Sequence, residues 1–336
     1  MDRNINTSGV LAADITRSAS KQTYYTIRLF ADRERVADAY RAYAYFRWVD
    51  DVIDGEMGLS EERTAFADRQ KALLEACYRH EIPENLCAEE WMLVDVIHHD
   101  TEKNSGLQTY LRDMMDVMVF DARRRGQIIS QVELFEYSHK LAKAVTEALY
   151  YFIGHDDPSP RHEARYHAVT AAHITHMLRD AVEDVQNGYF NIPREFLATR
   201  GVSPEDITSR AYRDWVCGRV QLARNYFKLG RECTAQVKNL RCRLAGYAYT
   251  ARFEWMLDAI EREDYCLRAD YPERKSWMAG LWMGWSALTS LFASLWIKAE
   301  PQNLVPQHAR IGKVPVSQVQ VSILQRDAAE DGGLSG

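Results

Sequence analysis

Residues 43–54 of this 336-residue chain read YAYFRWVDDVID, and residues 180–184 read DAVED. Both stretches carry carboxylates four positions apart, so each stretch would present them from one face of a helix. An arginine precedes each group, Arg47 in the first stretch and Arg179 in the second. Two such helices that face each other could hold divalent cations against a diphosphate, and the two stretches predict this arrangement.

The carboxylates of the predicted site come from both stretches: Asp50, Asp51, Asp54, Asp180, Glu183 and Asp184. Mg²⁺ prefers oxygen ligands and is usually held by one or two carboxylates together with substrate phosphates. A departing diphosphate also needs cationic donors, for which Arg47, Arg179 and Lys21 are the candidates. Tyr43 lies one helical turn before Arg47, where it could orient that arginine or contact the phosphate.

A solvated helix face is the alternative explanation for either acidic run, and it is the commoner one for a single run. Two observations favour a metal site. Residues 42–49, which lead into Asp50, are apolar and aromatic, and a second cluster of similar spacing follows later in the chain. Aromatic rings in this approach could line a cavity that shields a carbocation from water, since aromatic faces stabilise cations. Spacing alone leaves both alternatives open.

The composition limits the class of protein. The chain has 42 basic and 48 acidic residues and a net charge of −6, which argues against a nucleic-acid binder. Six cysteines without a CxxC pair, and no apolar signal-peptide core, predict a reduced, cytoplasmic protein. Residues 277–297 are uncharged and predict a buried helix, with peripheral membrane contact through this segment as the alternative.

Helical periodicity dominates the chain, with apolar residues every three or four positions. The pattern predicts helices over residues 33–53, 61–80, 89–101, 107–124, 132–153, 161–187, 211–237 and 243–262. Ser203 followed by Pro204 is typical of an N-cap and the first position of a helix. We expect one all-α domain over residues 16–299, a flexible N-terminus over 1–15 and a disordered tail over 300–336.

At the acidic stretches the chain resembles a known family. Residues 43–54 are similar to the first aspartate-rich motif of the squalene/phytoene synthases, and residues 177–188, MLRDAVEDVQNG, are similar to the second. Residues 189–207 and the segment around Lys21 also follow the family pattern, so that the resemblance covers roughly residues 18–275. It implies the class I isoprenoid synthase fold, an all-α bundle around a central cavity with the two motifs on opposing helices.

The resemblance implies an enzyme, a Mg²⁺-dependent transferase that ionises an allylic prenyl diphosphate and forms a C–C bond. Farnesyl or geranylgeranyl diphosphate is the expected substrate, and the best-known members join two prenyl diphosphates head to head. The alternatives are transfer of one prenyl group to a non-prenyl acceptor, such as an aromatic or indole compound, and cyclisation. A non-catalytic relative is disfavoured because all the motif carboxylates are present.

The chain departs from the family pattern at a few positions. His173 and His176 stand where the family usually has a glutamine and an asparagine. His176 shares a helix stripe with Asp180 and is a candidate metal ligand that would suit Mn²⁺ or Zn²⁺ better than Mg²⁺. Hydrogen bonding in the cavity is the alternative for both histidines. Lys143 and Thr146 replace glycines in the middle helix. Lys143 would either obstruct a second hydrocarbon chain or extend toward solvent.

Overall fold

A computed structural model describes residues 6–55, 60–155 and 160–271, and these residues form an all-α fold. The α-helices are α1 (Asn6–Ala19), α2 (Lys21–Phe30), α3 (Val36–Asp54), α4 (Ser60–Tyr78), α5 (Ala88–His99), α6 (Gly106–Arg124), α7 (Gln131–Phe152), α8 (His167–Gln186), α9 (Arg194–Arg200), α10 (Arg210–Thr234) and α11 (Leu240–Arg262). Short 3-10 helices precede α3 and α8, at Arg33–Arg35 and Glu163–Tyr166. The prediction of an all-α protein is confirmed.

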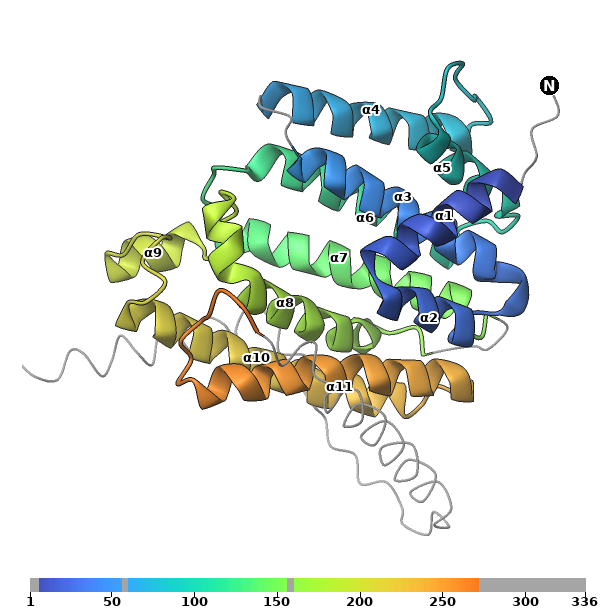
Figure 1. Cartoon of the computed structure of the whole chain (residues 1–336). Coiled ribbons are helices and arrows are strands. Elements are labelled where there is room, and N and C mark those ends of the chain that lie inside the picture. Colours follow the sequence, from blue (N-terminus) through green and yellow to red (C-terminus); the bar gives the residue numbers. More distant parts are fainter. Residues whose placement is uncertain (1–5, 56–59, 156–159, 272–336) are drawn as a thin grey trace, which may run out of the picture. The chain divides into compact units, whose positions relative to one another are not determined.

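In Figure 1, α4, then α3 with α6, then α7, α8 and finally α10 with α11 follow one another from top to bottom. α6 packs against α7, α7 against α8, and α8 against α10. α3, which carries the first acidic stretch, packs against α6 at one end of this row, whereas α10 packs against α8 at the other end. Tyr137 of α7 contacts both halves of the hydrophobic core, which meet at this helix.

A buried polar network fixes α3 against its neighbours. The Tyr45 hydroxyl donates to Gln70 Oε1 at 3.1 Å, and Gln70 Nε2 donates to Glu90 Oε1 at 2.9 Å. Glu90 also pairs with Arg69 and accepts the backbone N–H of Cys87 at 3.0 Å, which caps α5. Because every member has a partner, the network sets the orientation of the helix that carries the first acidic stretch.

Periodicity does not predict α1, α2 or α9. The sequence predicts a flexible segment over residues 1–15, whereas α1 begins at Asn6 and packs against α3. Ala12 and Thr16 lie one turn apart on α1 and are fully buried. Small residues at this spacing allow close packing of helices, although their low hydrophobicity gives only a weak periodic signal.

The prediction that a helix begins at Ser203 is wrong. The Ser203 backbone N–H donates to Asp206 Oδ2 at 2.8 Å, and the Asp206 N–H donates to the Ser203 carbonyl at 3.1 Å, which closes a turn. α10 begins at Arg210, with Ser209 as the N-cap that accepts the Tyr212 N–H at 3.1 Å. Proline is favoured in the second position of a turn as well as at the start of a helix, so Pro204 did not distinguish the two.

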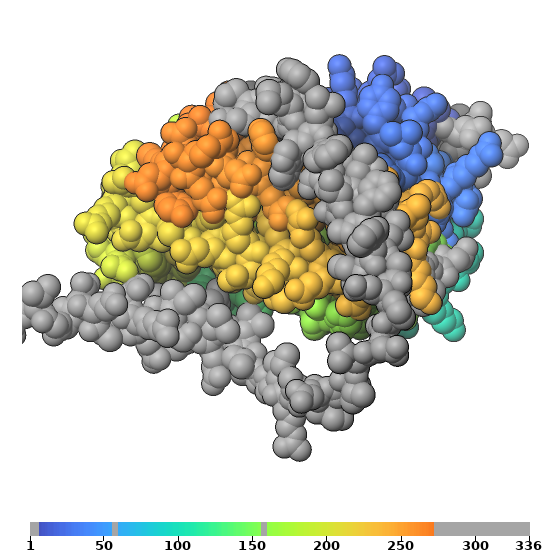
Figure 2. Space-filling view, turned by 90° about the horizontal axis from the view of Figure 1, so that it is seen from below, coloured from blue at the N-terminus to red at the C-terminus, as the bar shows by residue number. Residues whose placement is uncertain are grey.

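α10 and α11 lie next to each other on the face seen in Figure 2. None of the helices in the described ranges is long and apolar enough to cross a membrane. Residues 277–297, for which membrane contact is the alternative, lie outside the described ranges, as does the predicted tail over 300–336. The six cysteines, all within the described ranges, form no disulfide.

Candidate active site

The first group of carboxylates lies in the last turns of α3, where it contacts its own arginine. Arg47 Nε donates to Asp51 Oδ2 at 3.1 Å, and Arg47 Nη1 donates to Asp50 Oδ2 at 3.3 Å. The Arg47 side chain is 42% exposed. Arg47 is therefore paired with carboxylates of its own helix, while part of its side chain remains open to solvent.

The second group lies in the last turns of α8 and shows the same local pairing. Arg179 Nε donates to Asp180 Oδ1 at 2.6 Å. His176 Nδ1 lies 3.3 Å from Asp180 Oδ2, with 54% of the His176 side chain exposed. His176 is therefore next to a predicted metal ligand, on the helix stripe that the spacing predicts. Glu183 is exposed and Asp184 is half-buried.

One further carboxylate, Asp121 of α6, lies between the two groups of carboxylates. Asp121 Oδ1 accepts a hydrogen bond from Arg124 Nε at 2.6 Å, and Asp121 Oδ2 accepts the Tyr137 hydroxyl at 3.1 Å. Arg124 Nη1 donates to Asn191 Oδ1 at 2.9 Å. Asn191 Nδ2 in turn donates to Asp184 Oδ2 at 2.8 Å. A continuous network thus runs from α6 to the second acidic group.

Tyr189 connects this network to the first group. Its hydroxyl donates to Asp54 Oδ1 at 2.9 Å, and its backbone N–H donates to the Asp184 carbonyl at 2.7 Å. The preceding Gly188 has φ +82°, a left-handed conformation that favours glycine and reverses the chain after α8. The turn that ends α8 therefore places the tyrosine that contacts α3.

The site contains more negative charge than its arginines offset. The pKa of Asp50 is raised to about 7, first by burial and next by the neighbouring Asp54. Burial also raises the pKa of Asp184 to about 7, with Asp180 as the next cause. Asp121 contributes to both shifts, and burial raises its own pKa. Since one buried carboxylate acts on both groups, they lie around a common interior region.

Sequence reasoning did not assign Asp121, Arg124, Tyr189 or Asn191 to the site. Asp121 has no carboxylate three or four positions away on its helix, and Arg124 is one of three consecutive arginines, so neither carries a motif by spacing. Tyr189 and Asn191 belong to the stretch that resembles the family, but that resemblance gave them no role. Their position directly after the second acidic group was the available signal.

Lys21 and Tyr43 lie nearer the edge of this arrangement. Lys21 is the first residue of α2, is exposed, and makes no ion pair within the part of the chain that the structure describes. Tyr24, one turn later, stacks on Tyr40 of α3 with ring centroids 5.2 Å apart. Tyr43 is half-buried on α3 one turn before Arg47. These contacts hold α2 against α3, but they do not bring Lys21 to a carboxylate.

His173 is buried below the second acidic group. It is 7% exposed, its ring makes an edge contact with Tyr137 at 5.1 Å, and Nε2 has no hydrogen-bonding partner among the described residues. Burial lowers the pKa of His173 well below its usual value. Burial thus disfavours the charged imidazole, and within the described ranges Nε2 does not make the hydrogen bond expected for the alternative role in the cavity.

Lys143 pairs with α6. Its Nζ lies 3.1 Å from Asp113 Oδ2, and 39% of its side chain is exposed. This ion pair agrees with the alternative in which the lysine extends toward the surface, and it leaves the interior face of α7 to smaller side chains such as Ala142 and Thr146.

The carboxylates of this site suit the way in which proteins usually bind Mg²⁺. No three Asp, Glu, His or Cys side chains in the described ranges come together as a metal cluster. Mg²⁺ rarely needs such a cluster, because it is usually bound by one or two carboxylates and by substrate phosphates. Asp50 and Asp184 suit this mode, since a nearby divalent cation would lower both raised pKa values and offset the excess negative charge.

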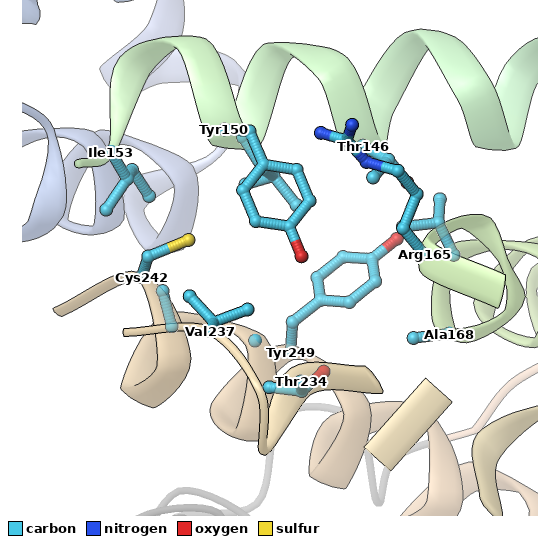
Figure 3. A pocket seen from close by; sticks show the side chains of 13 residues that line it. Thr146, Tyr150, Ile153, Arg165, Ala168, Thr234, Val237, Cys242 and Tyr249 are labelled. Atoms are coloured by element: carbon cyan, nitrogen blue, oxygen red, sulfur yellow. The ribbon is translucent and has the colours of Figure 1, made fainter. Parts of the chain in front are cut away.

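A cavity of about 50 Å³ lies at the other end of α8 (Figure 3). Thr146 and Tyr150 of α7, Val169 of α8 and Tyr249 of α11 help to line it. Val169 lies on the same face of α8 as Asp180, eleven residues later. At 1.5 Å per residue, the cavity is about 16 Å along the helix from that carboxylate.

Curated relatives include a chloroplastic phytoene synthase of an Oncidium hybrid cultivar, 26% identical over 254 residues, which are 73% of this chain and 59% of that protein. A presqualene diphosphate synthase of Zymomonas mobilis is 29% identical over 195 residues, which are 58% of this chain and 63% of that protein. The chain thus spans about three fifths of the length of these relatives.

The fold is similar to that of solved structures. The crystal structure of squalene synthase HpnC from Alicyclobacillus acidocaldarius aligns with a TM-score of 0.62 and 18% identity, covering 79% of this chain and 97% of that one. The model of the squalene/phytoene synthase family matches residues 16–278, which are most of the chain and include both acidic groups. The chain belongs to the squalene/phytoene synthase family.

Proposed function

We propose that this protein ionises an allylic prenyl diphosphate with Mg²⁺ and joins the prenyl cation to a second prenyl diphosphate in a head-to-head condensation. The observation that carries the proposal is the interior region between α3 and α8, where Asp50 and Asp184 both have pKa values raised to about 7. Carboxylates held in this state suit a site that is completed by cations and diphosphate.

The acidic residues would hold the metal: Asp50, Asp51, Asp54, Asp180, Glu183 and Asp184. Bound Mg²⁺ supplies positive charge that neutralises the departing diphosphate. Arg47 and Arg179 would leave their carboxylate partners and donate hydrogen bonds to the phosphate oxygens, with Lys21 approaching from α2 and Tyr43 orienting Arg47. His176 would serve as a further metal ligand, which makes Mn²⁺ the alternative metal.

The interior of the bundle suits the hydrocarbon part of such a substrate. Farnesyl or geranylgeranyl diphosphate would lie along α8, with its diphosphate near Asp180 and its end toward the cavity lined by Val169 and Tyr150. Lys143 supports a path for a second chain because 39% of its side chain is exposed and its Nζ pairs with Asp113 of α6. A wall of apolar and aromatic side chains also keeps water from the cation.

The proposal is tested by incubating the purified protein with Mg²⁺ and farnesyl or geranylgeranyl diphosphate and measuring the product mass. A C30 or C40 product is expected. Diphosphate release without such a product would instead indicate transfer to another acceptor, cyclisation or hydrolysis. Asp116→Asn, a change on the surface of α6 next to Lys71 and Lys140, serves as the matched control and should keep the wild-type product.

A further inference from the structure

Asp54 occupies an unfavourable position for a carboxylate that has to hold a metal ion in a fixed place. It is the last residue of α3, where the partial negative charge of the helix C-terminus disfavours an acidic side chain. The residue is exposed, and its only side-chain hydrogen bond within the described ranges joins Oδ1 to the Tyr189 hydroxyl at 2.9 Å. The orientation of this carboxylate therefore depends on a residue 135 positions later in the chain.

The backbone around Tyr189 is bound both to α8 and to the loop that follows α6. The Tyr189 N–H donates to the Asp184 carbonyl at 2.7 Å. The carbonyl of the preceding Gly188 accepts the Gly126 N–H at 2.7 Å, and the residue after Tyr189 forms a parallel β-bridge with Ile128. These contacts fix the turn that carries Tyr189 to two separate elements of the bundle.

The ring of Tyr189 is also held in place by its neighbours. The residue is buried, and the guanidinium carbons of Arg124 and Arg125 lie 5.1 and 5.9 Å from its ring centroid. Arg124 is itself paired with Asp121 at 2.6 Å. A cation over an aromatic ring stabilises it, and this contact does not involve the hydroxyl. Removal of the hydroxyl alone should therefore leave the ring in place and release only Asp54.

We propose that Tyr189 is a positioning residue for the metal, which holds Asp54 at a fixed place relative to the second acidic group so that both groups act on one diphosphate. The hydrogen bond occupies Asp54 Oδ1 and leaves Oδ2 for the metal. Hydrogen bonds of this kind orient metal ligands, and their loss typically costs about tenfold to a hundredfold in metal affinity. The inference rests on the proposed function, because it takes Asp54 as a metal ligand.

Binding of Mn²⁺ alone to the full chain tests this role, with the free ion measured by electron paramagnetic resonance. Mn²⁺ accepts the same oxygen ligands as Mg²⁺, and its signal reports binding without catalysis. Tyr189→Phe should weaken Mn²⁺ binding by about tenfold, because it removes the hydroxyl and keeps the ring. Wild-type affinity in this variant would overturn the proposal.

Tyr166→Phe is the matched control. The Tyr166 hydroxyl donates to Glu147 Oε1 at 2.8 Å, so this variant also removes a hydrogen bond between a tyrosine and a carboxylate, but at the other end of α8. It should bind Mn²⁺ like the wild type. Equal weakening in Tyr166→Phe and Tyr189→Phe would show a general effect on the fold and would exclude a positioning role.

A second measurement does not involve the metal. Urea unfolding in a chelator compares the wild type with Tyr189→Phe, Asp54→Ala and the double variant. The hydrogen bond should appear as a coupling of about fivefold in the unfolding equilibrium constant, because its acceptor is a carboxylate. Additive effects of the two substitutions would show that the contact on which the proposal depends is not made in solution.

Diphosphate release from farnesyl diphosphate separates this inference from the proposed function. Tyr189→Phe should retain most of the wild-type kcat at saturating Mg²⁺ but require about tenfold more Mg²⁺ for half of that rate. A lower kcat with an unchanged Mg²⁺ requirement would refute the positioning role alone. Failure of the proposed function gives a different result, since the wild type would then neither bind Mn²⁺ nor release diphosphate.

Discussion

The buried carboxylates of this chain are of two kinds. Some have enough hydrogen-bond donors and ion-pair partners to stabilise their charge, and others have too few. Glu90 accepts hydrogen bonds from Gln70 and the Cys87 N–H and pairs with Arg69, so that its pKa is lowered despite burial. Asp50 and Asp184 have fewer donors, and burial raises both pKa values. Carboxylates whose charged form is disfavoured by burial indicate a functional site more strongly than carboxylates that are fully paired.

The raised pKa values predict a pH dependence of stability. Between the ordinary value of 3.8 and the folded value of about 7, the unfolded chain has released protons that the folded protein still holds at Asp50 and Asp184. The metal-free protein should therefore be most stable below about pH 4 with respect to these groups, and should lose that stability as the pH rises to about 7. Thermal unfolding in a chelator across this range measures the effect.

Asp50→Asn and Asp184→Asn should each flatten this pH dependence and raise the melting temperature at neutral pH by a few degrees, roughly. The Asp50 side chain is 41% exposed, so that water screens part of its effect and Asp184→Asn should change the profile more. Asp68→Asn, at an exposed ion pair with Arg123, is the control. Profiles that match the wild type in both variants would show that these carboxylates are not held in an unfavourable state.

The position of His176 predicts which metal ion the site prefers. It stands where the family usually has an asparagine and lies 3.3 Å from an Asp180 oxygen. His176→Asn should lower the apparent affinity for Mn²⁺ by about tenfold and leave the Mg²⁺ affinity less affected, because imidazole suits transition metals better than Mg²⁺. Activity titrations with each metal measure this, with exposed His98→Asn as the control. Parallel losses for both metals would contradict a ligand role for His176.

At the scale of elements, the site depends on how α3, α6 and α8 are held together. The sequence predicted the two acidic groups, because carboxylates at i and i+4 form a pattern on a helix. It did not predict Asp121, because this residue has no carboxylate three or four positions away on α6 and its role depends on helices distant in sequence. It also placed a helix start at Ser203, where a turn competes for the same residues.

Asp121 predicts a large stability effect for a polar substitution. Asp121→Asn removes the carboxylate that pairs directly with the buried Arg124, so it should lower the free energy of unfolding by about 3 kcal/mol. Urea unfolding measures this, and Asp116→Asn on the same helix should cost less than about 1 kcal/mol because its lysine partners are exposed. Equal costs in the two variants would mean that the Asp121 network does not hold α6 to the acidic groups.

At the scale of the whole molecule, periodicity predicted eight of the helices and the all-α fold, because long amphipathic helices repeat one signal many times. The depth of the interior was not predictable. It depends on side chains such as Tyr150 and Tyr249, which come from helices far apart in sequence and meet only in the folded protein (Figure 3).

The cavity at the end of α8 predicts the length of the prenyl chain. Tyr150→Ala should deepen the interior and shift the ratio of kcat/KM values from farnesyl toward geranylgeranyl diphosphate by about tenfold. Tyr249→Phe removes a hydroxyl but keeps the ring, so it should leave the ratio unchanged. Steady-state kinetics with the two donors test this, and an unchanged ratio in Tyr150→Ala would place the end of the chain elsewhere.

The central claim is that the two acidic groups ionise a prenyl diphosphate together with a divalent metal. Release of inorganic diphosphate from farnesyl or geranylgeranyl diphosphate tests it most directly, with wild type, Asp50→Asn and Asp184→Asn compared in Mg²⁺ and in a chelator. We expect Mg²⁺-dependent release by the wild type and a loss of at least about a hundredfold in each variant, whose fold is preserved. Release that is independent of metal, or that persists in both variants, would contradict the claim.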